Sequence, residues 1–132
     1  MTTQKPLQTA KRPVNLDLST IKQPLPALVS ISHRITGVML FVGLIFALWA
    51  FDASLSSERG FEAVRDALAH NFFAKLVAWG LLSALALHFV AGIRHMAMDL
   101  HFADDREGGI RTSKIVIIAS AVLILLAGVW VW

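Results

Sequence analysis

The sequence contains no cysteine and no tyrosine, and charged residues make up only 16% of its 132 residues. Without cysteine, the chain can form no disulfide and can hold no iron–sulfur cluster through its own thiolates. Any redox cofactor must therefore be held by other side chains. Without tyrosine, an aromatic belt at a membrane surface must be built from tryptophan, of which the sequence has four.

Two further absences narrow the possible functions. The formal net charge is only +3, and the basic residues form no patch with interleaved aromatic residues, which argues against nucleic-acid binding. Residues 1–23 are polar and basic and lack the apolar stretch of a cleaved signal peptide. We therefore expect residues 1–26 to form a polar segment that precedes the first apolar run.

Hydrophobic residues make up 56% of the sequence and are gathered into three long runs. The runs predict spans at about residues 27–51, 72–98 and 115–132, each near the ~20 residues that a helix needs to cross a bilayer. Backbone groups in lipid must form their hydrogen bonds internally, which favours helices. We predict an all-α membrane protein in which residues 27–132 form one domain of three transmembrane helices.

The two connections between the spans differ in character. In residues 52–71, Ala63, Val64, Ala67 and Leu68 share one stripe, which predicts a short amphipathic helix at the membrane surface. Residues 99–114 are charged and end in GGIRTSK, which we interpret as a turn into the third span.

The distribution of basic residues predicts the orientation. The N-terminal side and the second connection, with the adjoining span ends, carry nine of the twelve Lys and Arg residues. By the positive-inside rule, the N-terminus and the second connection face the cytoplasm. Three spans then leave the C-terminus on the opposite side.

Polar residues within the spans are the candidates for function, because such residues are costly in lipid. Ser30, His33 and Arg34 follow i, i+3, i+4 spacing and share one helix face, which Gly37 extends. A hydroxyl, an imidazole and a guanidinium on one face can bind a carbonyl oxygen or a carboxylate. The alternative for Arg34 alone is that it extends to the lipid headgroups.

A second group lies in the second span around His88, which has no charged residue within five positions. It lies about 16 Å along the helix from Asp99, near the middle of the bilayer. Such a histidine can hydrogen-bond across helices, relay protons or ligate haem iron. Gly92, one turn away, leaves space for a flat macrocycle. Arg94 and His95 lie nearer the cytoplasm, at a level where haem propionates would find cationic partners.

A six-coordinate haem needs two axial ligands, and His88 is the only histidine at this depth. Met39 and Met96 are weaker candidates for the second position. We therefore expect another subunit to supply the second ligand.

Two stretches carry a specific family resemblance. They are RPVNLDLSTIKQPLPALVSISHRITG at residues 12–37 and HFVAGIRHMAMD at residues 88–99, with LSSERGFE at residues 55–62 in support. Together they resemble the cytochrome b membrane-anchor subunit of succinate dehydrogenase (succinate:quinone oxidoreductase, respiratory complex II). The family pattern has a small residue or Val where this chain has His101, which lies beyond the span.

The resemblance implies a role for each polar residue. His88 matches the axial ligand of haem b, and Ser30 and Arg34 match residues of the ubiquinone site. His33 and Arg34 match positions near the haem propionates, and His95 is a further candidate for that environment. The haem would be shared with a partner subunit, and ubiquinone would be the substrate.

The resemblance also implies partners and a location. A second small membrane-anchor subunit would supply the other haem ligand and pack with this chain into a helical bundle. An iron–sulfur subunit and a flavoprotein subunit would dock on the cytoplasmic face and pass electrons from succinate oxidation to quinone. The location would be the bacterial cytoplasmic (inner) membrane.

Two other functions fit the residues taken alone. One is an anchor or assembly subunit without a cofactor, in which His88 serves only in packing. The other is a small transporter with His88 in a proton path.

Overall fold

The computed structural model describes residues 20–103 and 105–132, which form four α-helices and no strand. The helices are α1 (Leu25–Ser56), α2 (Glu58–His70), α3 (Phe72–Asp99) and α4 (Arg106–Val131). Helices α1, α3 and α4 are long and apolar enough to cross a membrane. This confirms the prediction of an all-α protein with three spans. The predicted short helix in the first connection is α2.

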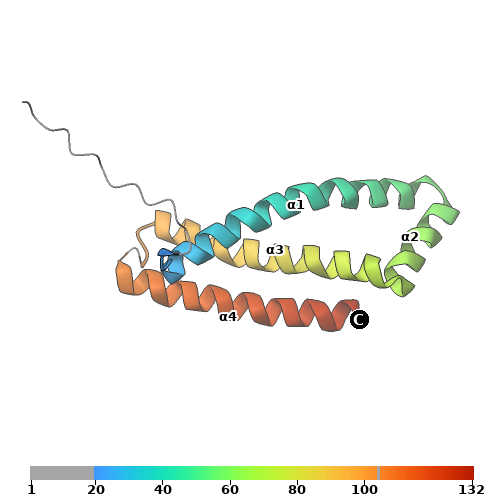
Figure 1. Ribbon diagram of the computed structural model, residues 1–132. Helices are drawn as coiled ribbons and strands as arrows, with labels where there is room; N and C mark the ends of the chain where they lie inside the picture. The colour runs from blue at the N-terminus through green and yellow to red at the C-terminus, as the bar shows by residue number, and fades with distance from the viewer. Residues whose placement is uncertain (1–19, 104) are drawn as a thin grey trace, which may run out of the picture.

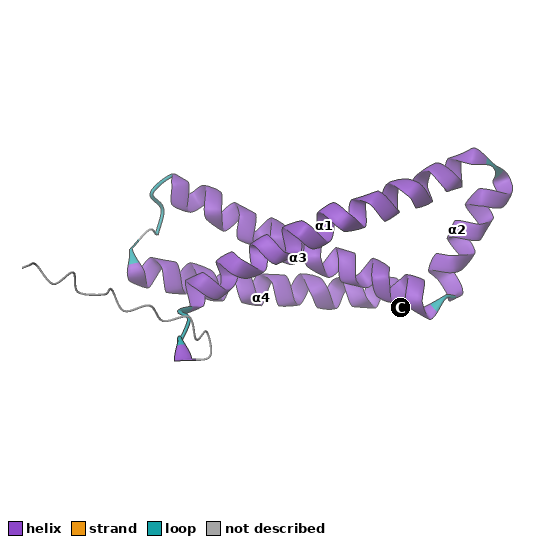
Figure 2. Ribbon diagram, turned by 45° about the horizontal axis from the view of Figure 1, so that its top comes forward, coloured by secondary structure: helices purple, strands orange, loops and turns teal. Residues whose placement is uncertain are grey.

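The three long helices pack side by side, with α3 between α1 and α4 and with α1 crossing α3 (Figures 1 and 2). The start of α1 and the turn between α3 and α4 lie at one end. Helix α2 and the C-terminus lie at the other end, where the ring of Trp132 lies 5.3 Å from that of Phe72. The start of α1 and the end of α4 are therefore on opposite sides of the bundle, as three crossings require.

Short breaks separate the helices. Pro24 precedes α1 without a side-chain capping hydrogen bond, and Pro26 lies in the first turn, where a missing N–H costs no helical hydrogen bond. The Ser57 side chain accepts a hydrogen bond from Gly60 N at 3.0 Å and begins α2. The Asn71 side chain accepts one from Ala74 N at 3.1 Å and begins α3. Capping side chains thus replace the bonds lost at the breaks.

Helix α4 begins much earlier than predicted. The interpretation of GGIRTSK as a turn is wrong, because residues 106–114 form the first turns of α4. The Asp105 side chain accepts a hydrogen bond from Gly108 N at 3.2 Å, which caps the helix. Gly108 and Gly109 are buried, so packing of this turn overrides the poor helix propensity of glycine.

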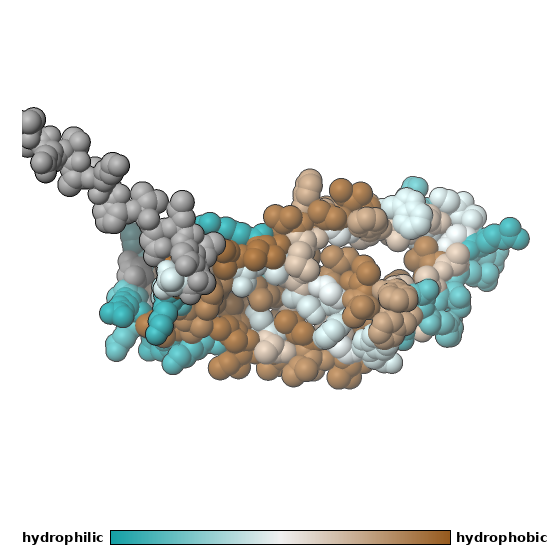
Figure 3. Space-filling view, in the orientation of Figure 1, coloured by the Kyte–Doolittle hydropathy of each residue, from teal (hydrophilic) through white to brown (hydrophobic). Residues whose placement is uncertain are grey.

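Most large apolar side chains point outward. The buried hydrophobic residues of the described part are few, and none is larger than valine: Val29, Ala84, Ala91 and Val116. Figure 3 shows an apolar surface between hydrophilic ends. In water such an apolar surface would promote aggregation, so lipid or partner helices must cover it.

A side-chain hydrogen bond to the backbone joins α3 to α4. Trp79 Nε1 donates to the carbonyl oxygen of Ile124 at 3.0 Å. A Cβ added at Gly128 would lie 3.2 Å from Trp79 Nε1, so the glycine makes room for the indole. This contact holds the outer halves of the two helices together where few large side chains are buried.

We expect Trp79→Phe to lower the free energy of unfolding by about 1–2 kcal/mol, because it removes a hydrogen bond and part of a packed ring. Trp130→Phe is the matched control, since Trp130 is 81% exposed. Denaturant unfolding of the purified protein in detergent measures both. Equal losses in the two variants would contradict a specific role for Trp79.

Candidate functional site

His88 lies on α3 where α1 crosses it, half-buried between the two helices. Its Nδ1 atom is 3.0 Å from the carbonyl oxygen of His33 on α1. A carbonyl oxygen can only accept a hydrogen bond, so Nδ1 must carry the proton. No described residue hydrogen-bonds to the Nε2 atom. His88 therefore has one ring nitrogen anchored to α1 and the other free to bind.

Two further imidazoles lie near this crossing: His33 packs against His88, and His95 lies next to His33. The ring of His33 stacks on that of His88, with centroids 4.0 Å apart and planes inclined by 13°. The ring of His95, on α3, is 5.0 Å from that of His33 and tilted by 48°. We call these three residues the imidazole cluster. The structure thus brings together the histidine that the sequence predicts on α1 and the two that it predicts on α3.

Two glycines allow the helices to approach closely enough for this cluster. A Cβ added at Gly37 on α1 would lie 3.1 Å from His88 Cε1. A Cβ added at Gly92 on α3 would lie 3.5 Å from His33 Nε2. Each glycine therefore faces the imidazole of the opposite helix, and the contact at Gly37 is the tighter one. The space that the sequence assigns to a macrocycle at Gly92 is used by the His33 ring.

Arg94 is buried but points away from the imidazole cluster. Its Nε atom donates to Thr112 Oγ1 at 3.0 Å, and Nη2 donates to the carbonyl oxygen of Gly109 at 3.3 Å. The sequence places Arg94 and His95 at one level, but adjacent helix residues point in directions about 100° apart. Arg94 therefore joins α3 to the first turns of α4, a role that sequence spacing did not reveal.

Ser30 and Arg34 lie one helical turn apart near the start of α1. Ser30 is half-buried and Arg34 is exposed. Neither side chain forms a hydrogen bond or ion pair with any described residue. Their hydroxyl and guanidinium donors are thus available for a ligand. The sequence signature that starts at Arg12 extends into residues outside the described part of the chain.

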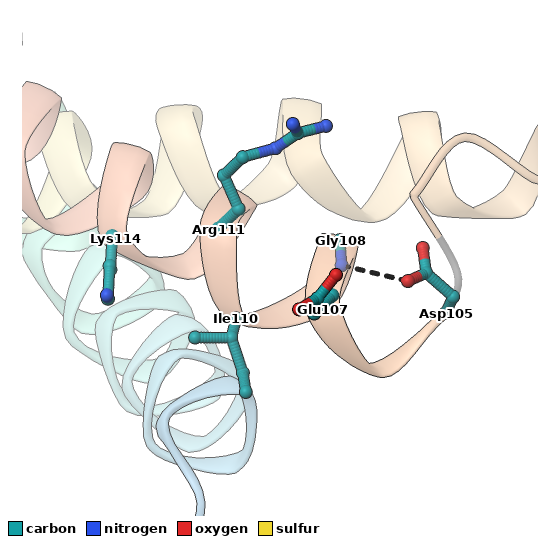
Figure 4. Close-up of a pocket in the computed structure, with 6 residues that line it drawn as sticks. All are labelled: Asp105, Glu107, Gly108, Ile110, Arg111 and Lys114. Atoms are coloured by element: carbon teal, nitrogen blue, oxygen red, sulfur yellow. Dashed lines mark hydrogen bonds between the residues drawn. The ribbon is translucent and has the colours of Figure 1, made fainter.

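One pocket of the described surface lies away from these residues. It has a volume of about 510 Å³ and is lined by Asp105, Glu107, Gly108, Ile110, Arg111 and Lys114 (Figure 4). Two acidic and two basic side chains balance its charge, and Asp105 is occupied in capping α4. An apolar groove of about 380 Å³ lies between α1 and α3 and includes Gly43 and Leu81. Neither hollow contains a residue of the imidazole cluster.

The donor set suits one axial position of a haem rather than a complete metal site. No group of three or more His, Cys, Asp or Glu among residues 20–103 and 105–132 could hold a metal ion. A haem needs from the protein only its axial ligands, and His88 Nε2 offers one. His33 cannot offer the second in this arrangement, because its ring lies face to face with that of His88. A second imidazole ligand would have to direct a ring nitrogen toward the iron rather than lie against the ring of the first.

Comparison with known proteins shows which family the sequence matches. The family model for the succinate dehydrogenase/fumarate reductase transmembrane subunit matches residues 8–127. The succinate dehydrogenase cytochrome b556 subunit of Coxiella burnetii is 42% identical over 123 residues, covering 93% of this chain and 98% of that protein. The corresponding subunit of Paracoccus denitrificans is 31% identical over 115 residues, covering 87% and 88%. The mitochondrial cytochrome b560 subunit of Dictyostelium discoideum is 31% identical over 97 residues, covering 70% and 48%.

The two facing glycines give a matched pair of variants. We expect Gly37→Ala to lower the free energy of unfolding by about 1–3 kcal/mol, because His88 is held by its hydrogen bond and cannot easily yield to the new Cβ. Gly92→Ala adds only an ordinary contact, so the better helix propensity of alanine leaves stability unchanged or raised by up to ~1 kcal/mol. Thermal unfolding of the purified protein measures both. The same change in both variants would contradict the close approach at Gly37.

Proposed function

This chain belongs to the succinate dehydrogenase/fumarate reductase transmembrane-subunit family and is a membrane-anchor cytochrome b subunit of succinate dehydrogenase. On this premise we propose that it binds haem b jointly with a second anchor subunit and forms part of the ubiquinone-reduction site. The observation that carries the proposal is the free Nε2 of His88, inside an apolar span, on an imidazole whose other nitrogen is anchored.

His88 is the proposed axial ligand of the haem. An imidazole nitrogen without a partner is costly within a membrane, and coordination to iron would satisfy it. The hydrogen bond from Nδ1–H to a backbone carbonyl is the usual support for a ligating histidine. When bound, the haem supplies a centre that reversibly takes up one electron.

The proposed second anchor subunit supplies the other axial ligand. The face-to-face packing of His33 and His88 supports a ligand from outside this chain. The exposed apolar surface of α1, on which Phe41 is 71% exposed, is suited to cover by partner helices as well as by lipid. The proposed flavoprotein and iron–sulfur subunits dock at the end formed by the start of α1 and the α3–α4 turn, which faces the cytoplasm by the positive-inside rule.

Ser30 and Arg34 are the proposed quinone-binding residues. The Ser30 hydroxyl donates a hydrogen bond to one carbonyl oxygen of ubiquinone. The Arg34 guanidinium stabilises the negative charge that develops on the quinone oxygens as electrons arrive. Two electrons from succinate oxidation and two protons convert the quinone to the quinol. The absence of any bound partner for either side chain in the described part of the chain supports this assignment.

His33, Arg34 and His95 form the proposed environment of the haem propionates. The rings of His33 and His95 lie 5.0 Å apart, and the His33 ring stacks on that of His88. Their ring nitrogens and the Arg34 guanidinium can donate hydrogen bonds to carboxylates.

The protein is a multi-pass membrane protein, and the proposed location is the bacterial inner membrane. Electrons delivered there to ubiquinone would enter the respiratory chain from the tricarboxylic acid cycle.

We expect Arg34→Ala to lower kcat/KM for succinate–ubiquinone reduction about 100-fold and Ser30→Ala about tenfold. Each variant lacks a hydrogen-bond donor to a quinone oxygen on which negative charge develops during reduction. Arg65→Ala and Ser54→Ala, at the opposite end of the bundle, are the matched controls. Reduction of an artificial dye by succinate should stay unchanged in all four variants. Full ubiquinone reductase activity in both Ser30→Ala and Arg34→Ala would rule out their role.

For the haem, His88→Ala in the complex co-expressed with its partner subunits should lose the low-spin bis-histidine spectrum. His70→Ala is the control, because His70 pairs with Asp66 on exposed α2. Redox difference spectra of the purified complexes measure this. An unchanged low-spin spectrum in His88→Ala would exclude His88 as the ligand.

A further inference from the structure

Thr36 lies at the same helix crossing as His88, and its side chain is buried. Its Oγ1 atom is 2.9 Å from the carbonyl oxygen of Ser32, 3.0 Å from that of His33 and 3.4 Å from His88 Nδ1. Contacts with the carbonyl oxygens three and four residues earlier are common for a threonine in a helix, whereas the contact with His88 reaches another helix. Among residues 20–103 and 105–132, Thr36 has the one side chain within hydrogen-bonding distance of the anchored nitrogen of His88.

The available donors and acceptors assign the hydroxyl proton. The carbonyl oxygen of His33 has two lone pairs. The N–H of Gly37 takes one in the regular helical pattern, and Nδ1–H of His88 takes the other. The Thr36 hydroxyl therefore donates its proton along the shorter contact, to the carbonyl oxygen of Ser32. The lone pairs of Oγ1 then face the Nδ1–H group as a second acceptor.

We propose that Thr36 is a positioning residue for His88. Its hydroxyl and the His33 carbonyl form a two-oxygen seat that holds the imidazole with its proton on Nδ1, which leaves Nε2 as the nitrogen that would bind iron. The inference rests on the proposed function, since it concerns how an axial ligand is held. A hydroxyl that donates to Ser32 is also a better acceptor, because hydrogen bonds in a chain polarise one another.

The two oxygens disfavour two changes in the imidazole, a flip of the ring and a shift of its proton. Turning the ring over about its Cβ–Cγ bond would replace Nδ1 by a carbon, which cannot bond to the two oxygens. Moving the proton to Nε2 would place the lone pair of Nδ1 against the carbonyl oxygen of His33. Either change would prevent Nε2 from binding iron, because a carbon would replace it or a proton would occupy its lone pair. An acceptor on Nδ1–H also increases the electron donation of Nε2, which favours the ferric state.

Three substitutions of Thr36 separate the hydroxyl from the methyl group. Thr36→Val keeps the shape and loses the hydroxyl, whereas Thr36→Ser keeps the hydroxyl and loses the methyl. Thr36→Ala loses both and repeats the first test with a smaller side chain. Each is made in the complete complex. The measurements are the rate of haem loss to an acceptor protein, the haem midpoint potential and the electron paramagnetic resonance spectrum of the ferric haem.

We expect Thr36→Val and Thr36→Ala to lose haem about tenfold faster, in line with the loss of a supporting hydrogen bond to a metal ligand. Their midpoint potential should rise and their ferric g values should shift. Thr36→Ser should match the unsubstituted complex in all three measurements. A residue needed only for packing would show the reverse order, because valine fills the same volume and serine does not.

Wild-type haem behaviour in Thr36→Val and Thr36→Ala would overturn the inference, as would an equal defect in Thr36→Ser. Its failure can be told from that of the proposed function. If His88→Ala retains the low-spin spectrum, the ligand assignment itself fails. If His88→Ala loses haem while Thr36→Val is normal, only the role of Thr36 fails.

Discussion

The close crossing of α1 over α3 is the constraint on which the rest of the site depends. It needs Gly37 on one helix and Gly92 on the other, since each faces an imidazole of the opposite helix. At this distance the His88 ring reaches a backbone carbonyl of α1, which saturates one of its nitrogens. Small residues at a helix crossing thus do two things here. They allow the helices to pack without a hydrophobic driving force, and they determine which imidazole nitrogen remains free.

The contacts between α3 and α4 follow the same logic. Trp79 and Arg94 each donate a hydrogen bond to a backbone carbonyl of α4, near its end and near its beginning. Within lipid, apolar side chains gain little by packing on each other rather than on acyl chains, whereas polar groups gain a partner. A few such bonds can therefore align two helices whose outer faces remain apolar. Arg94 is accordingly a structural residue, although its charge and sequence position resemble those of a cofactor-binding residue.

The sequence predicted the spans well because their cause is local. Length and hydropathy decide whether a segment can cross a bilayer, and both are readable without a partner. The beginning of α4 was missed because Gly108 and Gly109 disfavour helix locally, and only burial against the bundle makes them helical. The directions of Arg94 and His33 were missed for a related reason. Helical spacing says which residues share a face but not which neighbour that face meets.

The amino-acid sequence by itself determined that the chain is a three-span membrane protein with a histidine inside an apolar span and polar residues near one end. Its motifs also determined the family. Only the tertiary structure decided that His33 stacks on His88, that Arg94 belongs to the α3–α4 contact, and that Nδ1 of His88 carries the proton. These facts depend on two helices that are distant in sequence meeting at one crossing. The atoms that saturate or free an imidazole nitrogen belong to the helix opposite, so no pattern within one helix can reveal them.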